Sequence, residues 1–416
     1  MRVPIVKTIC LVVQSVYDFD PRVRRKAEAL VAAGYSVDVL VLRPADGRKQ
    51  YTLNGVNVYT VSLGKQRGSL VRYLFEYSAF FAWTLVKVPR LMRHRQYAVI
   101  DVNTLPDFLI FAPIVARWMG ASLLLDMHEI TPEFYMSKYG ISDRSLIIRL
   151  LAWLEKISVR FADHVLTINE PILDLLVSRG LARSKATVIM NAVDEARFTP
   201  PAGAPRPAGA AERFVMMYHG TLTRTYGMDI AIEAFAIAHE HMPGAEIWIL
   251  GSGPESGPLA EQAKECGLSA KVKLFGQVAA REIPGWLSQC DMGILPFRRD
   301  VFLDFAFPNK LPEFIVAGKV VAIPRLKAVQ HYFSEDALVY FEPNSASALA
   351  EQMVRIYREE SVRRRMVARA REEYAPIRWE VQKGRYLDLV GELAGVSRRA
   401  AEPARRAEVS LPGVRS

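Results

Sequence analysis

Hydrophobic positions in the first half of the chain alternate between short β-rich runs and helical stripes. Apolar runs at residues 9–13, 37–42, 97–102, 123–126, 165–168 and 187–190 predict buried strands. Between the first two, Val23, Ala27 and Leu30 share one face of a helix over residues 21–33, and Gly34 ends it. Strands that alternate with helices predict a parallel sheet covered on both faces.

Two further helices are predicted in this half. Residues 146–161 carry an apolar stripe formed by Leu150, Leu154, Ile157 and Phe161. Asn169 stands at the start of the other helix, with Pro171 just inside it, which is the pattern of a helix N-cap.

The alternation is interrupted at residues 199–212, where prolines and glycines predict a linker. It restarts with strand-like runs at 214–218, 246–250, 272–275, 292–295, 320–323 and 338–341. After Ala346 the pattern is helical nearly to Leu393, with a break around Pro376. We therefore expect an α/β protein with a first Rossmann-like domain at 1–198, a second at 213–375, a helix at 376–394 and a disordered basic tail at 395–416.

Composition narrows the class of protein. The 416 residues suffice for two domains, and 50% hydrophobic with 24% charged residues is normal for a globular protein. The net charge of +10 suits an anionic partner such as a phosphorylated substrate, a membrane face or nucleic acid. No nucleic-acid motif accompanies the charge, so that class ranks last.

The cysteines and the apolar runs indicate where in the cell the protein is expected. Cys10, Cys266 and Cys290 are odd in number and far apart, which fits neither a zinc site nor a disulfide framework and favours a reducing cytoplasm. The first apolar run is broken by Lys7 and leads directly into a domain, so we interpret it as a strand rather than a secretory signal. The run at 77–86 is shorter than the roughly 20 residues that cross a bilayer.

Asp18 and Asp20 flank Phe19 just before the first helix. Paired carboxylates can hold a metal on a nucleotide diphosphate, but two are too few to assign a site. Asp20 immediately before Pro21 is also a good helix N-cap, and we favour the cap.

A glycine-rich segment, Gly251-Ser252-Gly253-Pro254, follows a predicted strand. Gly257 comes one residue late for the dinucleotide-binding fingerprint, and no acidic residue follows in the required place. We interpret the segment as a tight turn beside a ligand cleft.

Lys310 and Glu313 lie three residues apart where a loop opens into a helix, hence on one helical face. A lysine near a helix N-terminus suits phosphate, and a carboxylate one turn on can accept hydrogen bonds from sugar hydroxyls. A solvated Lys–Glu pair fits the same spacing. His128 follows the strand at 123–126, and that position favours a functional role over a purely structural histidine.

Together these segments resemble glycosyltransferase family four, a retaining family with the two-domain GT-B fold. The likeness spans residues 9–393 and rests on the order and spacing of residues 20–25, 33–37, 125–129, 191–194, 219–222, 226–227, 275–276, 308–313 and 317–322. It implies that the two domains face a cleft and that the helix at 376–394 packs back on the first domain.

The resemblance also assigns roles. It implies catalytic roles for His128, Lys310 and Glu313, with His128 contacting the transferred sugar. The implied donor-binding residues are Gly220, Thr221, Arg224, Gly251, Gly276, Pro308, Asn309, Lys310 and Glu313. The implied acceptor-side residues are Asp20, Arg22, His128 and Glu129.

Three features depart from the family pattern. Phe305 stands where the family commonly has the first of two glutamates, a loss that a Pro-Asn-Lys subgroup shares. Tyr226 replaces a lysine that contacts the donor diphosphate, so Arg224 and Lys310 are expected to share its role, with Lys310 favoured. The glycine pair often found in the first donor-domain loop is absent.

The resulting expectation is a metal-independent hexosyltransferase that moves a sugar with retention from a nucleotide diphosphate to a glycan or lipid-linked acceptor. Cell-envelope, lipopolysaccharide or exopolysaccharide synthesis is the expected setting, with no cofactor beyond the nucleotide-sugar substrate and no metal. Two alternatives stay open: a GT-B-like nucleotide-sugar epimerase, and a non-catalytic scaffold.

Residues 65–95 combine basic and aromatic side chains against a single acid, Glu76. The basic ones are Lys65, Arg67, Arg72, Lys87, Arg90, Arg93 and Arg95, and the aromatic ones are Tyr73, Phe75, Tyr77, Phe80, Phe81 and Trp83. Such a helix can lie in an anionic membrane interface, or it can pack on the sheet of its own domain. The first possibility predicts a cytoplasmic enzyme that is peripheral on the inner face of the plasma membrane.

Overall fold

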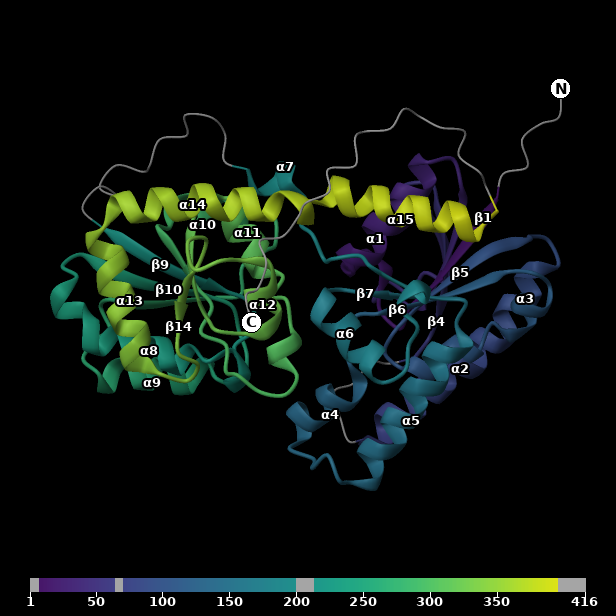
Figure 1. Ribbon diagram of the computed structural model, residues 1–416, viewed down its shortest axis with the longest axis horizontal. Helices are drawn as coiled ribbons and strands as arrows, with labels where there is room; N and C mark the ends of the chain where they lie inside the picture. Colours follow the sequence, from purple (N-terminus) through teal and green to yellow (C-terminus); the bar gives the residue numbers. More distant parts are fainter. Residues whose placement is uncertain (1–6, 64–69, 200–212, 396–416) are drawn as a thin grey trace.

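The computed structural model describes residues 7–63, 70–199 and 213–395 and contains two α/β domains (Figure 1). Each is built on a parallel sheet, with one antiparallel pair at the edge of the first. Most of the predicted linker, most of the predicted tail, and Lys65 and Arg67 lie outside the described residues. The expectation of two parallel-sheet domains is confirmed.

The first domain has an eight-stranded sheet of order β3-β4-β2-β1-β5-β6-β7-β8. Its strands are β1 (Thr8–Val12), β2 (Ser36–Leu42), β3 (Gln50–Leu53), β4 (Val56–Val61), β5 (Tyr97–Asn103), β6 (Ser122–Met127), β7 (His164–Thr167) and β8 (Ala186–Val188). Its helices are α1 (Pro21–Ala32), α2 (Leu70–Met92), α3 (Ile114–Trp118), α4 (Thr131–Tyr139), α5 (Leu146–Phe161), α6 (Glu170–Ser178) and α7 (Glu195–Phe198), with a 3-10 turn, η2, at Asp107–Phe111.

The second domain has a six-stranded sheet of order β11-β10-β9-β12-β13-β14, in which every pairing is parallel. Its strands are β9 (Phe214–His219), β10 (Ala245–Leu250), β11 (Val272–Gly276), β12 (Met292–Ile294), β13 (Val320–Pro324) and β14 (Val339–Phe341). Its helices are α8 (Met228–Ala238), α9 (Ser256–Glu265), α10 (Ile283–Gln289), α11 (Lys310–Val316), α12 (Lys327–Tyr332), α13 (Ala346–Arg358) and α14 (Glu360–Tyr374), and α15 (Trp379–Leu393) follows them.

Local sequence signals explain where several helices begin. The Asp20 side chain accepts hydrogen bonds from the backbone N–H groups of Arg22 and Val23, so it caps α1 as predicted. The Asn169 side chain accepts from the N–H of Ile172 and caps α6. Both caps place the start of a helix at the carboxyl end of the preceding strand region, where ligands of parallel sheets bind.

One hairpin was missed from the sequence. Strands β3 and β4 pair antiparallel at the edge of the first sheet, and Asn54 and Gly55 between them both have positive φ. An Asn-Gly pair with this geometry makes a tight hairpin turn, so the signal was present in the sequence.

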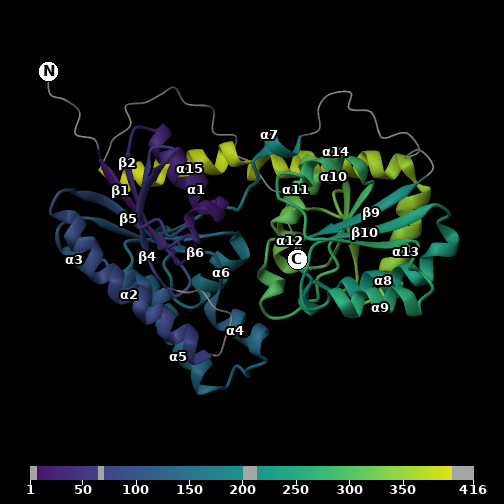
Figure 2. The ribbon, with the colours of Figure 1, turned by 180° about the vertical axis from the view of Figure 1, so that it is seen from behind.

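The C-terminal helix returns to the first domain, as expected (Figures 1 and 2). On α15, the Gln382 side chain accepts a hydrogen bond from the N–H of Met190 (2.9 Å), and the carbonyl of Leu393 accepts one from the hydroxyl of Ser122 (3.0 Å). The helix therefore ties the end of the second domain to the first sheet.

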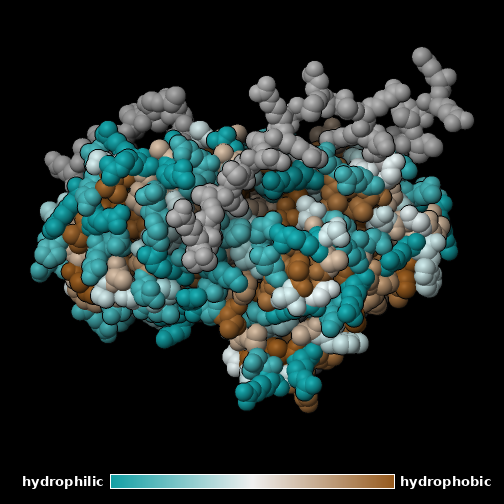
Figure 3. Space-filling model, viewed as in Figure 1, coloured by the Kyte–Doolittle hydropathy of each residue, from teal (hydrophilic) through white to brown (hydrophobic). Residues whose placement is uncertain are grey.

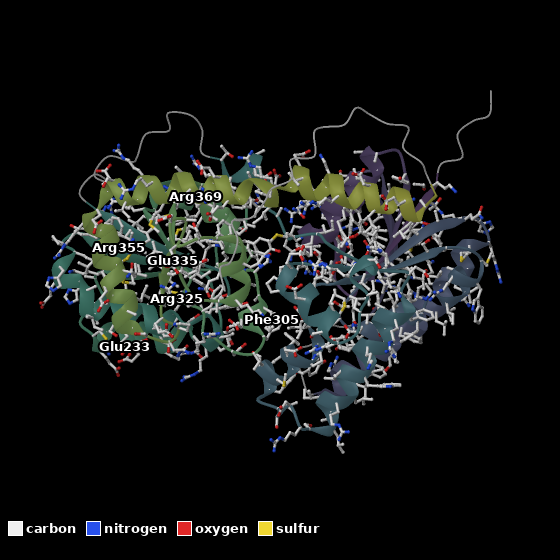
Figure 4. The ribbon with its side chains drawn as sticks, viewed as in Figure 1. Glu233, Phe305, Arg325, Glu335, Arg355 and Arg369 are labelled. Carbon is white, nitrogen blue, oxygen red and sulfur yellow. The ribbon has the colours of Figure 1, made fainter. Side chains whose placement is uncertain are left out.

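Direct contacts also join the domains at the carboxyl ends of their sheets. The Asn169 side chain donates to the carbonyl of Phe305 (2.8 Å), and the hydroxyl of Ser137 donates to Asp300 (2.7 Å). Figure 4 places Phe305 at the edge of the second domain that faces the first. None of the helices in the described ranges combines the length and the apolar character that a membrane span requires.

Candidate active site

Three glycine turns lie together at the carboxyl end of the second sheet. Gly220 follows β9, Gly251 follows β10, and the N–H of Gly251 donates to the carbonyl of Gly276 at the end of β11 (2.7 Å). Gly251 has φ +153°, and a Cβ there would lie 1.8 Å from the carbonyl oxygen of Gly220. Only glycine permits this stacking of loops, which agrees with the tight-turn interpretation of Gly251.

Lys310, the first residue of α11, lies against the first of these turns. A Cβ at Gly220 would stand 2.2 Å from Cε of Lys310. The ammonium sits over the rings of Tyr226 (4.8 Å), Tyr218 (5.5 Å) and Phe297 (5.8 Å). Burial lowers the pKa of Lys310, and Glu313 opposes that shift. A phosphate beside this lysine would favour its charged form.

Glu313 lies one turn further along α11, and its Oε2 is 3.2 Å from Nε2 of His219. Burial raises the pKa of Glu313 to about 7, against the opposing charges of Lys310, Arg197 and Arg25. Burial, with Lys310 nearby, lowers the pKa of His219 to about 3, so this imidazole is neutral. Glu313 is thus a half-buried carboxyl beside a neutral histidine, able to accept hydrogen bonds from a ligand's hydroxyls.

On the first domain, His128 follows β6 and belongs to a buried charge network. Its Nε2 lies 3.0 Å from Oδ2 of Asp126, and the Lys26 ammonium contacts both Asp126 and Asp101. Although burial acts in the opposite direction, His128 and Lys26 hold the pKa of Asp126 below its usual range. The Nδ1 of His128 is buried without a hydrogen-bond partner among the described residues. The network holds the imidazole through one nitrogen, while the ring itself borders both pockets described below.

Three of the four predicted acceptor-side residues, Arg22, His128 and Glu129, line two adjoining pockets. His128 and Arg22 line both of them, and Glu129 lines the second. The first pocket, about 20 Å³, is lined by Arg22, Arg25, Lys26, Asp126, His128, Leu166, Ile189, Met190, Asn191, Ala192 and Trp379. The second, about 240 Å³ and called the head pocket below, is lined by Val13, Gln14, Ser15, Arg22, Glu76, Tyr77, Thr104, Leu105, His128, Glu129, Phe134, Tyr135, Lys138 and Tyr139.

Asp20 stands apart from these pockets because its carboxylate caps α1 and pairs with Arg22 (3.3 Å). Asp18 accepts a hydrogen bond from the hydroxyl of Tyr51 (2.6 Å). Within the described ranges, no three His, Cys, Asp or Glu side chains are grouped so as to hold a metal ion.

The two halves of the site face each other. Burial raises the pKa of Tyr226 in the second domain, and the carboxylate of Glu129 in the first domain adds to the rise. Arg25 of the first domain is among the charges that act on Glu313 of the second. The structure therefore brings the candidate donor residues Gly220, Lys310 and Glu313 opposite the acceptor side.

Most of the other predicted donor residues at this end of the second domain are exposed to solvent. Thr221, Arg224 and Asn309 are exposed, and Pro308 is buried at the start of α11. The sequence prediction missed Arg25, which lines the first pocket one helical turn from Arg22. The i, i+3 spacing of these two arginines was the available signal.

Each of the two domains matches a known protein-family model. Residues 20–192 match the model of the glycosyl transferase 4-like domain, and residues 213–359 match that of the glycosyl transferases group 1. A glycogen synthase of Mycobacterium tuberculosis is 29% identical over 297 residues, which is 67% of this chain and 69% of the relative.

Solved structures share the two-domain fold. Sucrose-phosphate synthase from Thermosynechococcus elongatus superposes with a TM-score of 0.75 at 18% identity, over 94% of this chain and all of that one. Anabaena HepE in complex with UDP-glucose gives a TM-score of 0.69 at 17% identity, over 92% of this chain and 99% of that one.

Proposed function

Since the chain belongs to the glycosyltransferases of the GT-B fold, we propose that it transfers a sugar from a nucleotide diphosphate to a glycan or lipid-linked acceptor. The proposal places the donor on the second domain and the acceptor on the first. Synthesis of a cell-envelope glycan or exopolysaccharide is the proposed setting.

The observation that carries the proposal is the placement of Lys310 and Glu313 on one turn of α11, beside the Gly220 and Gly251 turns. In this proposal Lys310 neutralises the diphosphate as it leaves, and charge stabilisation of this kind is usually the largest contribution in such sites. Glu313 accepts hydrogen bonds from hydroxyls of the donor. The bound UDP-glucose of Anabaena HepE makes UDP-sugars the first donors to test.

His128 in the proposal faces the transferred sugar from the first domain. The Asp126–Lys26 network holds its Nε2, and its Nδ1 has no partner among the described residues. Arg22 and Glu129 then border the acceptor in the head pocket. The reaction proceeds with retention of configuration and without a metal or other cofactor.

We further propose that the enzyme is cytoplasmic and docks peripherally on an anionic membrane through α2. One side of α2 packs on its own domain, since Phe80, Thr84 and Val88 are buried. Near its start, however, Leu74 and Phe75 are 62% and 68% exposed. Packing and membrane contact are thus compatible along one helix. Flotation with anionic and neutral vesicles across a salt series tests the docking, and equal, negligible binding at low salt contradicts it.

A thermal-shift screen with nucleoside diphosphates and nucleotide sugars tests the proposed function, because a ligand of the folded state raises its apparent stability. We expect at least one nucleoside diphosphate to stabilise the protein. Product analysis of the best donor, alone and with candidate acceptors, then separates the alternatives. An epimerised nucleotide sugar formed without acceptor contradicts transfer, and failure to bind any nucleoside diphosphate favours a scaffold.

A further inference from the structure

We propose that the acceptor is an amphiphile whose hydrocarbon chain lies in an apolar groove between α2 and α5 while its polar end occupies the head pocket. This inference rests on the proposed function and names the class of acceptor, a lipid-linked one.

The groove, which we call the tail groove, has a volume of about 230 Å³ on the first domain. It is lined by Leu74, Tyr77, Leu105, Pro106, Asp107, Phe108, Thr131, Tyr135, Ile147, Leu150, Leu151 and Leu154, from α2, η2, α4 and α5 and the segment before η2. Figures 1 and 2 both show α2 and α5 running alongside each other below the sheet. Such a lining offers a chain of methylenes apolar contact and offers a sugar few hydrogen bonds.

The tail groove adjoins the head pocket. Tyr77, Leu105 and Tyr135 line both of them. The head pocket also contains Arg22, His128 and Glu129, so its polar end lies at the candidate active site. In the proposed complex one molecule spans the two, with its polar end at His128 and its apolar end in the tail groove.

Large apolar side chains at the rim of the tail groove are exposed to solvent. Leu74 is 62% exposed, Ile147 48% and Leu150 54%, and Phe75, Leu146 and Trp153 beside them are 68%, 78% and 55% exposed. Figure 3 shows hydrophobic surface over α4 and α5 at the lower edge of the first domain. Several large apolar side chains exposed along one groove favour a binding surface there, because exposing them to water is unfavourable.

The charges around this patch match the polar end of a membrane lipid. Arg149 and Lys156 on α5 are exposed, as is Arg144 just before α5. Arg72 on α2 is also exposed and pairs with Glu76 (3.1 Å). Basic side chains at an apolar rim favour anionic head groups and phosphate. The patch would thus rest at a membrane surface while one lipid chain enters the tail groove.

The single carboxyl in the tail groove does not oppose an apolar occupant. The Asp107 side chain accepts a hydrogen bond from the hydroxyl of Thr131 (2.8 Å), and its Oδ2 is buried without a partner among the described residues. Burial, with Glu155 nearby, raises the pKa of Asp107 to about 8. Near neutral pH this carboxyl is therefore largely uncharged, and a hydrocarbon chain can lie beside it.

The test compares the affinities of butyl phosphate and octyl phosphate, both below their micelle concentrations, by calorimetry. Each covered methylene should tighten binding roughly three- to fourfold, so covering only two of the four methylenes that octyl adds to butyl gives about a tenfold gain. We expect at least this gain in the wild-type protein. Leu150→Glu and Ile147→Glu place a charge in the tail groove at exposed positions that tolerate it. Both should abolish the gain and leave the affinity for butyl phosphate unchanged.

Trp118→Glu is the matched control, since Trp118 is a 76% exposed apolar residue on α3 outside the tail groove. It should keep the gain. Equal affinity for the two phosphates in the wild type, or the same gain in the groove variants, overturns the proposal. So does a wild-type dimer that Leu150→Glu converts to monomer, because the groove would then be an interface between copies. If the protein binds vesicles but shows no preference between butyl and octyl phosphate, the proposal is overturned in favour of membrane docking alone.

A UDP titration of every variant separates the two proposals. If the protein binds UDP but binds butyl and octyl phosphate equally well, only the tail-groove proposal is contradicted. If the wild-type protein binds no nucleoside diphosphate, the proposed function itself is contradicted.

Discussion

The hydroxyl of Tyr386 on the C-terminal helix donates a 2.7 Å hydrogen bond to Oδ2 of Asp101 on β5, within the first sheet. Asp101 also accepts from the ammonium of Lys26, which contacts Asp126 in turn. Asp126 lies 3.0 Å from His128. The chain segment that returns from the second domain therefore shares one buried network with the candidate catalytic histidine of the first.

We expect Tyr386→Phe to lower the free energy of unfolding by about 1.5–3 kcal/mol, because it removes a buried hydrogen bond to a charged acceptor. Chemical denaturation measures the change. Tyr357→Phe is the control, since its hydroxyl donates to the carbonyl of Pro243 (2.7 Å) at an exposed site. An equal loss in the two variants would contradict a special role for the buried network.

Replacement of His128 should separate turnover from nucleotide binding. In the proposed arrangement, His128 faces the sugar from the first domain, and the nucleoside diphosphate is held by the second. His128→Ala should lower kcat roughly 100-fold, the effect of removing one polar contact to the reacting group. Its affinity for the bare nucleoside diphosphate should stay near the wild-type value, and a matching loss in that affinity would refute the arrangement.

Lys310 should act mainly on the diphosphate. Loss of one charge-assisted contact weakens binding by about 1.5–3 kcal/mol, so Lys310→Ala should raise the Kd for a nucleoside diphosphate by roughly ten- to a hundredfold. Calorimetry tests this, with Lys264→Ala as control, because the Lys264 side chain is 70% exposed on α9. Unchanged affinity in Lys310→Ala would remove this residue from the donor site.

The raised pKa of Glu313 predicts a pH-dependent stability in the ligand-free protein. A pKa raised from 4.5 to about 7 means that the folded state binds the proton more tightly than the unfolded state. The resulting stability is present below pH 4.5 and is lost as the pH rises through 7. Glu313→Gln carries no such charge and should be more stable than the wild type at about pH 8, by about 2–3 kcal/mol, and similar at about pH 4.

Thermal unfolding across this pH range measures the effect. Glu233→Gln is the control, because Glu233 is an exposed residue of α8. If Glu313→Gln and the wild type keep the same pH dependence, the buried, protonated form of Glu313 is not present.

The sequence predicted those parts of the fold that depend on local periodicity. Strands, helix caps at Asp20 and Asn169, and the common face of Lys310 and Glu313 follow from spacing over a few residues. Because the carboxyl ends of parallel strands meet at one edge, the positions of His128 and Gly220 after strands could also be anticipated. These features needed no knowledge of how distant segments pack.

Features set by distant partners escaped prediction. The stripe on α5 includes Leu150, which is 54% exposed, whereas Glu155 on the same helix is buried. Glu155 is tolerated because Arg179 of the segment after α6 donates to it at 2.8 Å. Periodicity shows that a helix has two faces, but only the tertiary partners decide which face is covered. The Tyr386–Asp101 contact belongs to the same class, because it joins residues 285 positions apart in the sequence.

The most direct test of the central claim is an NMR assay of sugar transfer with excess EDTA present. The nucleotide sugar that stabilises the protein most would be incubated with an acceptor that supports transfer, and anomeric signals followed over time. We predict one nucleoside diphosphate released per sugar transferred and a product with the donor's anomeric configuration. We also predict that folded Glu313→Ala loses most of this activity. Inverted configuration, a wild-type rate in Glu313→Ala, or activity that returns only when magnesium or manganese is added would contradict retaining, metal-independent transfer at this site.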